Sequence, residues 1–88
     1  MTTPTREQVE TIVKKALRNL CWHETIDNAD TFRTLEFDEL DIIESLIDIE
    51  DDLHLGYNLD ENIFTFESTV EELINEVCRI LALPSETA

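Results

Sequence analysis

Apolar residues recur at helical spacing in three separate segments of this 88-residue chain, and this pattern restricts the chain to an all-α fold. Period-two alternation of β-branched residues is missing over any useful length, and the chain has only one Gly and two Pro. Helices are therefore the simplest interpretation of its long segments. Because a chain of this length supports one hydrophobic core, we expect a single domain over residues 1–88.

The first segment carries an apolar stripe that predicts a helix of about three turns. The stripe consists of Val9, Ile12, Val13, Ala16, Leu17 and Leu20. Two patterns mark its start, and each can cap the free backbone N–H groups: Thr3 before Pro4, or Thr5 with Gln8 three positions later. Residues 22–37 then lack helical periodicity, which predicts a long first loop. We expect its apolar residues to anchor it on the core, namely Ile26, Phe32, Leu35 and Phe37.

The second helix is predicted to begin at Asp38, whose side chain can cap the N–H of Leu40 or Asp41, and to end near Leu53. Its buried stripe is expected to consist of Ile42, Leu46, Ile49 and Leu53, widened by Ile43 and Ile47. Gly56, the only glycine, follows at a natural place for a positive φ angle.

The remaining sequence predicts one short and one longer helix. Residues 60–66 are expected to form a short helical turn that places Ile63, Phe64 or Phe66 inward. Ser68 with Glu71, or Thr69 with Glu72, can cap a last helix. The core face of this helix is predicted to consist of Val70, Leu73, Ile74, Val77, Ile80 and Leu81. The sequence thus predicts three main helices and one short helix.

Several short motifs accompany this order of elements: residues 28–32, Leu35, residues 38–46, residues 50–53 and residues 68–73. Together, the order and the motifs resemble the acyl carrier protein family over nearly the whole chain. The resemblance implies a four-helix bundle that holds an acyl chain and exposes its second helix to partner enzymes bearing Arg and Lys. The segment after the second helix is somewhat longer here than the family pattern.

Glu39 breaks the family pattern, because the family has a serine at this position that receives a phosphopantetheine arm. A carboxylate cannot form the same phosphodiester, so we expect no phosphopantetheine on Glu39 and no other cofactor. Three interpretations of Glu39 stay open. It is a first-turn carboxylate that suits the helix dipole, its charge replaces that of the phosphodiester, or it blocks attachment in a protein with a structural role.

The acidic second helix is the predicted partner-binding surface. The chain has a net charge of −15, and the segment from Asp38 to Asp52 holds eight carboxylates and no cation. A solvated acidic face accounts for the first turn, but carboxylates at the C-terminal end oppose the helix dipole. We therefore expect a partner protein with a basic patch, such as a carrier-dependent enzyme or an assembly with a carrier-like subunit. The resemblance assigns this docking to Asp38, Asp41, Glu44, Glu50 and Asp51, and Asp48 adds charge to the same predicted surface.

Two other functions stay open at this point. The first is a true acyl or peptidyl carrier of fatty-acid or polyketide-type biosynthesis. It would be modified at Ser45, where Glu44-Ser45-Leu46 imitates the local attachment pattern, or be a serine-to-glutamate variant at position 39. Against Ser45, a helix that began there would break the apolar stripe. The second is an acidic mimic of nucleic acid that occupies a DNA-binding protein. Direct binding of nucleic acid by this chain is not expected, since phosphate contacts need clustered cations.

Other chemistry is not indicated by the sequence. His23 and His54 stand at no metal-ligand spacing, and no catalytic pair is supported, so we expect neither a metal site nor an enzyme. Cys21 and Cys78 are expected to be reduced thiols. No stretch approaches the ~20 apolar residues of a membrane-spanning helix, and no secretory signal is visible. We expect a cytoplasmic protein that is monomeric when free.

Overall fold

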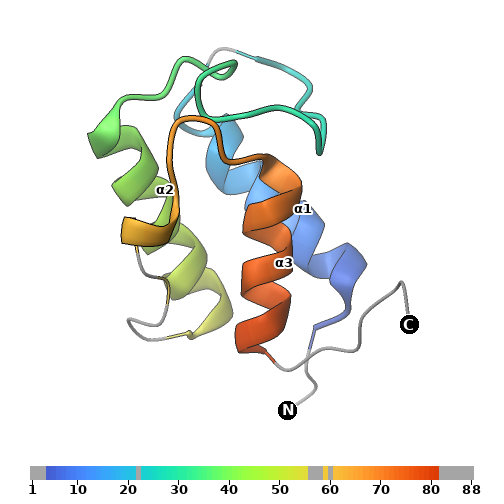
Figure 1. Cartoon of the computed structure of the whole chain (residues 1–88). Coiled ribbons are helices and arrows are strands. Elements are labelled where there is room, and N and C mark those ends of the chain that lie inside the picture. Colours follow the sequence, from blue (N-terminus) through green and yellow to red (C-terminus); the bar gives the residue numbers. More distant parts are fainter. Residues whose placement is uncertain (1–3, 22, 56–58, 60, 82–88) are drawn as a thin grey trace.

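The computed structural model describes residues 4–21, 23–55, 59 and 61–81, and within them the chain is all-helical. Long connections join three α-helices: α1 (Arg6–Arg18), α2 (Glu39–Leu53) and α3 (Val70–Ile80). A short 3-10 helix, η1 (Glu61–Ile63), lies between α2 and α3 in the sequence. Helix α1 packs against both α2 and α3, while η1 packs against α2 (Figure 1). The radius of gyration of 12.1 Å matches the ~12 Å expected of a compact chain of this length.

Side-chain caps set the beginning of each α-helix. The Thr5 hydroxyl accepts a hydrogen bond from the Gln8 backbone N–H, and the Gln8 side chain accepts one from the Thr5 N–H. Of the two predicted starts of α1, the structure therefore has the second. At α3 the cap is Thr69, whose hydroxyl accepts from the Glu72 N–H. Ser68 is buried and accepts from the Thr65 N–H instead.

The first loop is held to the core by the apolar residues predicted for that role. Ile26, Phe32, Leu35 and Phe37 are all buried, and the rings of Phe32 and Phe37 stack at 5.8 Å between centroids. Glu36, at a φ of 61°, lies between these residues, where the Phe37 N–H bonds back to the Phe32 carbonyl. This turn leaves Asp38 at the start of α2.

The first loop also fixes the start of α3 through its backbone. The Asp30 and Asn28 carbonyls accept from the N–H groups of Val70 and Glu71, which are among the first N–H groups of α3 and have no partner inside the helix. A single antiparallel bridge joins Thr31 to Thr69, and no strand forms among the described residues. Figure 1 shows this loop lying over the ends of α1 and α3.

One core prediction was wrong and another was only partly met. Ile47, expected on the buried stripe of α2, is 47% exposed. In the segment after α2, η1 covers three residues, and Ile63 is 52% exposed while Phe64 and Phe66 are half-buried against the core. The left-handed residue that ends α2 is His54, with φ of 55°. Gly56, predicted for that role, lies outside the described residues.

None of the helices in the described part of the chain is both long enough and apolar enough to cross a bilayer.

Candidate interaction surface

The first turn of α2 is organised by two of its carboxylates. Asp38 is the N-cap, and its carboxylate accepts a 2.8 Å hydrogen bond from the Asp41 backbone N–H. The Asp41 carboxylate reaches back and accepts from the Asp38 N–H at 3.2 Å. The predicted cap at Asp38 is therefore confirmed. Glu39 follows as the first helical residue, exposed at the end of α2 where the helix dipole favours negative charge.

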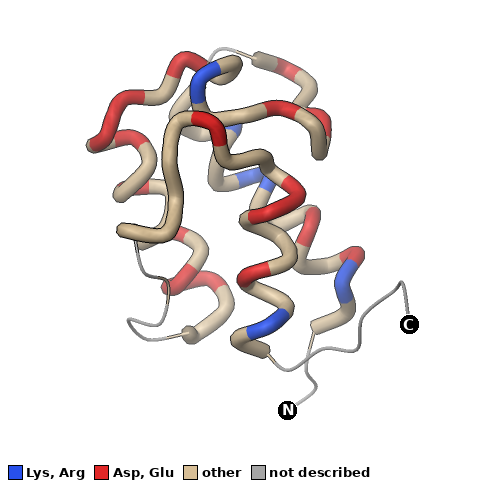
Figure 2. The backbone as a smooth tube through the Cα atoms, viewed as in Figure 1, with Lys and Arg blue, Asp and Glu red and all other residues tan. Residues whose placement is uncertain are grey.

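Most carboxylates of α2 lie at the surface. Of the eight between Asp38 and Asp52, six are exposed, Asp41 is half-buried and Glu50 is buried. Figure 2 shows acidic residues along the length of α2 without a Lys or Arg among them. We call the six exposed residues the acidic face of α2: Asp38, Glu39, Glu44, Asp48, Asp51 and Asp52.

Four of the six Lys and Arg form ion pairs away from α2. Among the described residues, ion pairs join α1, the loops and α3, and none involves a residue of α2. The pairs are Arg6 with Glu71 (3.7 Å), Lys14 with Glu10 (3.9 Å), Arg33 with Glu67, and Arg79 with Glu76 (2.6 Å). The acidic face of α2 therefore receives no ion pair from the described part of its own chain.

Glu50 does not belong to the exposed surface, although the resemblance assigned it there. The residue is 7% exposed, and its carboxylate accepts a hydrogen bond from the Leu59 backbone N–H at 3.1 Å. The Glu50 carbonyl also accepts from the Leu55 N–H at 2.9 Å. Glu50 thus holds the chain that leaves α2, and its side chain is turned away from any partner at the acidic face.

Ser45, the alternative attachment position, lies in the core. Its relative exposure is 0%, and its hydroxyl donates a 2.7 Å hydrogen bond to the Ile42 carbonyl. An enzyme that transfers a phosphopantetheine arm needs access to the hydroxyl oxygen, and this fold does not give that access. Ser45 instead packs on the buried side of α2 and satisfies its own polar atom.

Apolar residues interrupt the acidic face, and the sequence did not predict this. Leu40 is 67% exposed and Ile47 is 47% exposed. Leu40, Glu44, Ile47 and Asp51 follow one another at helical spacing, so that apolar and acidic side chains alternate along one side of α2. The exposure of Leu40 could have been predicted from its position, since Leu40 falls on the polar side of the predicted helix.

A pocket of about 310 Å³ lies where η1 packs against the first half of α2. It is lined by Glu39, Ile42, Ile43, Asn62 and Phe64. This pocket could not be predicted from the sequence, because it depends on how the segment around η1 folds back onto α2. Glu39 is therefore one wall of a small pocket that also has apolar side chains and the Asn62 amide in its lining.

Metal-ligating and sulfur groups are dispersed in the structure. No three His, Cys, Asp or Glu side chains of the described residues are grouped so that they would hold a metal ion. Cys21 is half-buried and Cys78 is buried, and both are free thiols.

Comparison with known proteins finds no matching family model, curated protein or solved structure.

Proposed function

We propose that this protein is a non-enzymatic, acyl-carrier-like four-helix binding module that docks the acidic face of α2 on a basic surface of a partner protein. The observation that carries the proposal is the charge of α2, which holds eight carboxylates between Asp38 and Asp52 and no cation. Six of them are exposed, and none has an ion pair among the described residues. A partner with Lys and Arg supplies the missing countercharge.

The cost of this charge arrangement supports a binding role. Glu44, Asp48 and Asp51 stand three or four residues apart, and like charges at this spacing cost a helix about 0.2–0.5 kcal/mol per pair. Asp48, Asp51 and Asp52 also lie toward the C-terminal end of α2, where negative charge opposes the helix dipole. When a partner docks, its cations turn the repulsion between these carboxylates and their unfavourable interaction with the dipole into attraction. The electric field of the acidic face also speeds association with a basic partner.

The partner class follows from the carrier resemblance. A long first loop, an exposed acidic second helix and the motifs around Asp38 agree with a carrier-like bundle, while Glu39 offers no hydroxyl for an arm. We therefore propose a partner that recognises carrier proteins by their second helix. It is either a carrier-dependent enzyme that this protein regulates or an assembly that uses a carrier-like subunit.

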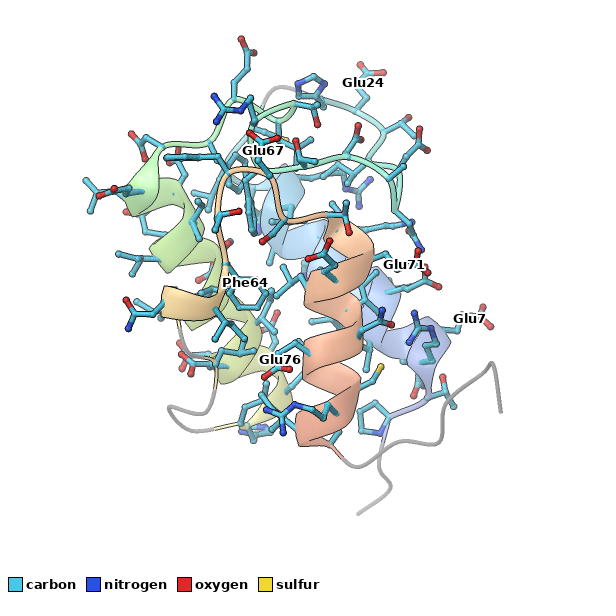
Figure 3. All side chains as sticks on the ribbon, in the orientation of Figure 1. Glu7, Glu24, Phe64, Glu67, Glu71 and Glu76 are labelled. Carbon is cyan, nitrogen blue, oxygen red and sulfur yellow. The ribbon has the colours of Figure 1, made fainter. Side chains whose placement is uncertain are left out.

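The test is a charge reversal with a matched control. Glu44→Lys combined with Asp51→Lys changes the acidic face, whereas Glu7→Lys with Glu24→Lys changes the net charge equally. Figure 3 shows Glu7 and Glu24 away from α2, and both are exposed. We expect proteins captured by the wild type from a cell extract to be captured by the control pair and lost with the α2 pair. Equal capture by all three proteins contradicts the proposal.

A carrier function has its own test, which is the intact mass after incubation with a phosphopantetheinyl transferase and coenzyme A. We expect no change in mass, because Glu39 lacks a hydroxyl and the hydroxyl of Ser45 is buried. A gain equal to one phosphopantetheine arm on this chain identifies a true carrier instead. The Ser45→Ala variant then tells whether that residue is the attachment site.

A further inference from the structure

The pocket between α2 and η1 combines three apolar side chains with two polar ones, the Glu39 carboxylate and the Asn62 amide. Ile42 is buried, Ile43 and Phe64 are half-buried, and Glu39 is exposed. Figure 3 shows Phe64 beside η1, and its ring meets the Phe32 ring edge to face at 6.3 Å between centroids. The aromatic wall is thus held by the core, while the acidic wall belongs to the acidic face of α2.

The volume of the pocket and the charge of its lining limit which chemical groups can bind in it. A volume of about 310 Å³ is at the lower end of the ~300–1,000 Å³ of small-molecule sites, which suits one long side chain. An anionic group is disfavoured by Glu39 and by the net charge of −15. A bare metal ion would lose its hydration against three apolar side chains. An aliphatic stem that ends in a cation fits both the apolar side chains and the Glu39 carboxylate.

Elsewhere in this protein, an arginine side chain already contacts an aromatic ring and a carboxylate. The Arg33 guanidinium carbon lies 5.7 Å from the centroid of the Phe66 ring, and its Nε donates to the Glu67 carboxylate. Phe64 and Glu39 likewise place an aromatic ring and a carboxylate in the lining of the pocket. Among the described residues, however, Glu39 has no ion pair. The cation that would complete this site must therefore come from another molecule.

We infer that the pocket receives an arginine side chain of the basic partner. The guanidinium pairs with the Glu39 carboxylate and lies against the Phe64 ring, while its methylene stem contacts Ile42 and Ile43. Arginine is favoured over lysine because its planar head matches both a carboxylate and a ring face. This inference rests on the proposed function, since the arginine belongs to the surface that docks on α2. It also assigns Glu39 a role as an anchor.

The test uses small probes, so it does not require the partner. The full chain is titrated with N-acetyl-arginine methylamide while backbone amide resonances are followed by NMR. Saturable shifts are expected at Ile42, Ile43 and Phe64. The citrulline analogue has the same shape without the charge, and it is expected to bind about tenfold more weakly, as is reasonable for one cation–π contact and one charged hydrogen bond. The lysine analogue should also bind more weakly than arginine.

One matched pair of variants and a third variant assign the contacts. Glu39→Gln keeps the size of the side chain and is expected to abolish the preference for arginine over citrulline. Glu44→Gln removes an equal charge one turn further along α2 but does not line the pocket, and it should keep that preference. Phe64→Leu keeps an apolar wall and should reduce the preference for arginine over lysine. Dispersed amide spectra establish that each variant is folded.

Three results contradict the inference: equal binding of arginine and citrulline, equal losses in Glu39→Gln and Glu44→Gln, or shifts confined to Asp48–Asp52. The last two would identify the acidic face as a diffuse electrostatic surface. Such a result leaves the proposed docking intact, since docking is tested separately by charge reversal at Glu44 and Asp51. Conversely, failed capture with saturable arginine binding would contradict the proposed function and retain the pocket.

Discussion

The individual carboxylates of α2 have different structural roles, although they belong to the same two residue types. Asp38 and Asp41 exchange hydrogen bonds with each other's backbone N–H at the start of the helix. Glu50 is buried and binds the Leu59 N–H, whereas Glu44 is exposed. Structural and surface carboxylates therefore alternate within one helix, and substitutions should separate them.

Asp38→Ala removes the side-chain acceptor of the α2 cap. We expect it to lower the free energy of unfolding by about 1 kcal/mol, because the Asp41 N–H loses its partner. Asp38→Asn keeps an oxygen that can accept this bond and should lose only a small part of that amount. Urea denaturation followed by circular dichroism measures both variants. Equal stability of Asp38→Ala and the wild type would contradict the role of the cap.

Glu50→Ala tests the buried carboxylate. The change leaves the Leu59 N–H without its acceptor, and an unsatisfied buried donor costs about 1–3 kcal/mol. Glu50→Gln preserves an acceptor oxygen and should be less destabilising. Hydrogen exchange at the Leu59 amide gives a local readout, with faster exchange expected in Glu50→Ala than in Glu50→Gln. If Glu50 were instead a surface residue, neither stability nor exchange would change.

At the level of elements, the two sides of α2 should respond very differently to truncation. Ile49 is 0% exposed, so Ile49→Ala is expected to cost about 2–5 kcal/mol through lost burial and a cavity. Ile47 is 47% exposed, and Ile47→Ala should cost about 1 kcal/mol or less. Thermal or urea denaturation of the two variants compares them directly. Similar losses would mean that α2 packs with a different rotation about its axis.

Helix α3 carries the ion pair with a defined pH dependence. The Arg79 guanidinium donates to the Glu76 carboxylate, and this hydrogen bond lowers the pKa of Glu76 from its ordinary 4.5. The pair therefore stabilises the fold above the ordinary pKa, and this contribution is lost as the pH falls through the lower pKa of the folded state. We expect Glu76→Gln to lower stability slightly at neutral pH.

The loss in Glu76→Gln should shrink as the pH is taken below 4.5, where the carboxyl of the unfolded chain becomes protonated, and vanish below the lowered pKa of the folded state, where the folded wild-type carboxyl is protonated too. The pair is at the surface, so the effect is small and weakens with salt. Denaturation curves at several pH values give the measurement. A difference that grows toward acid pH would show that the pair does not act as described.

Helix positions and caps were predictable because they depend on residues close in sequence. Thr5 with Gln8 and Asp38 with Asp41 are each three positions apart, and their hydrogen bonds are local. The error at Ile47 arose because two adjacent stripes on α2 are apolar, and only packing against α1 and η1 decides which is covered. The burial of Glu50 depends on Leu59, which lies beyond the end of the helix.

At the level of the whole molecule, the structure concentrates unpaired negative charge on one helix. The net charge is −15, and the ion pairs of the described residues lie on α1, on α3 and on the loops. The sequence predicted an acidic second helix, but it could not predict how the cations are distributed or that η1 forms a pocket beside Glu39. The pocket and the Arg6–Glu71 and Arg33–Glu67 pairs arise from contacts between distant segments, whereas the other two ion pairs are local to one helix.

The most direct test of the account is the affinity of the captured partner for three proteins as a function of salt. These are the wild type, the Glu44→Lys/Asp51→Lys pair and the Glu7→Lys/Glu24→Lys pair. We predict that the wild type and the Glu7/Glu24 pair bind with similar affinity that falls steeply with salt, and that the Glu44/Asp51 pair binds at least about tenfold more weakly at low salt. Equal affinities of the two double variants would contradict docking through α2.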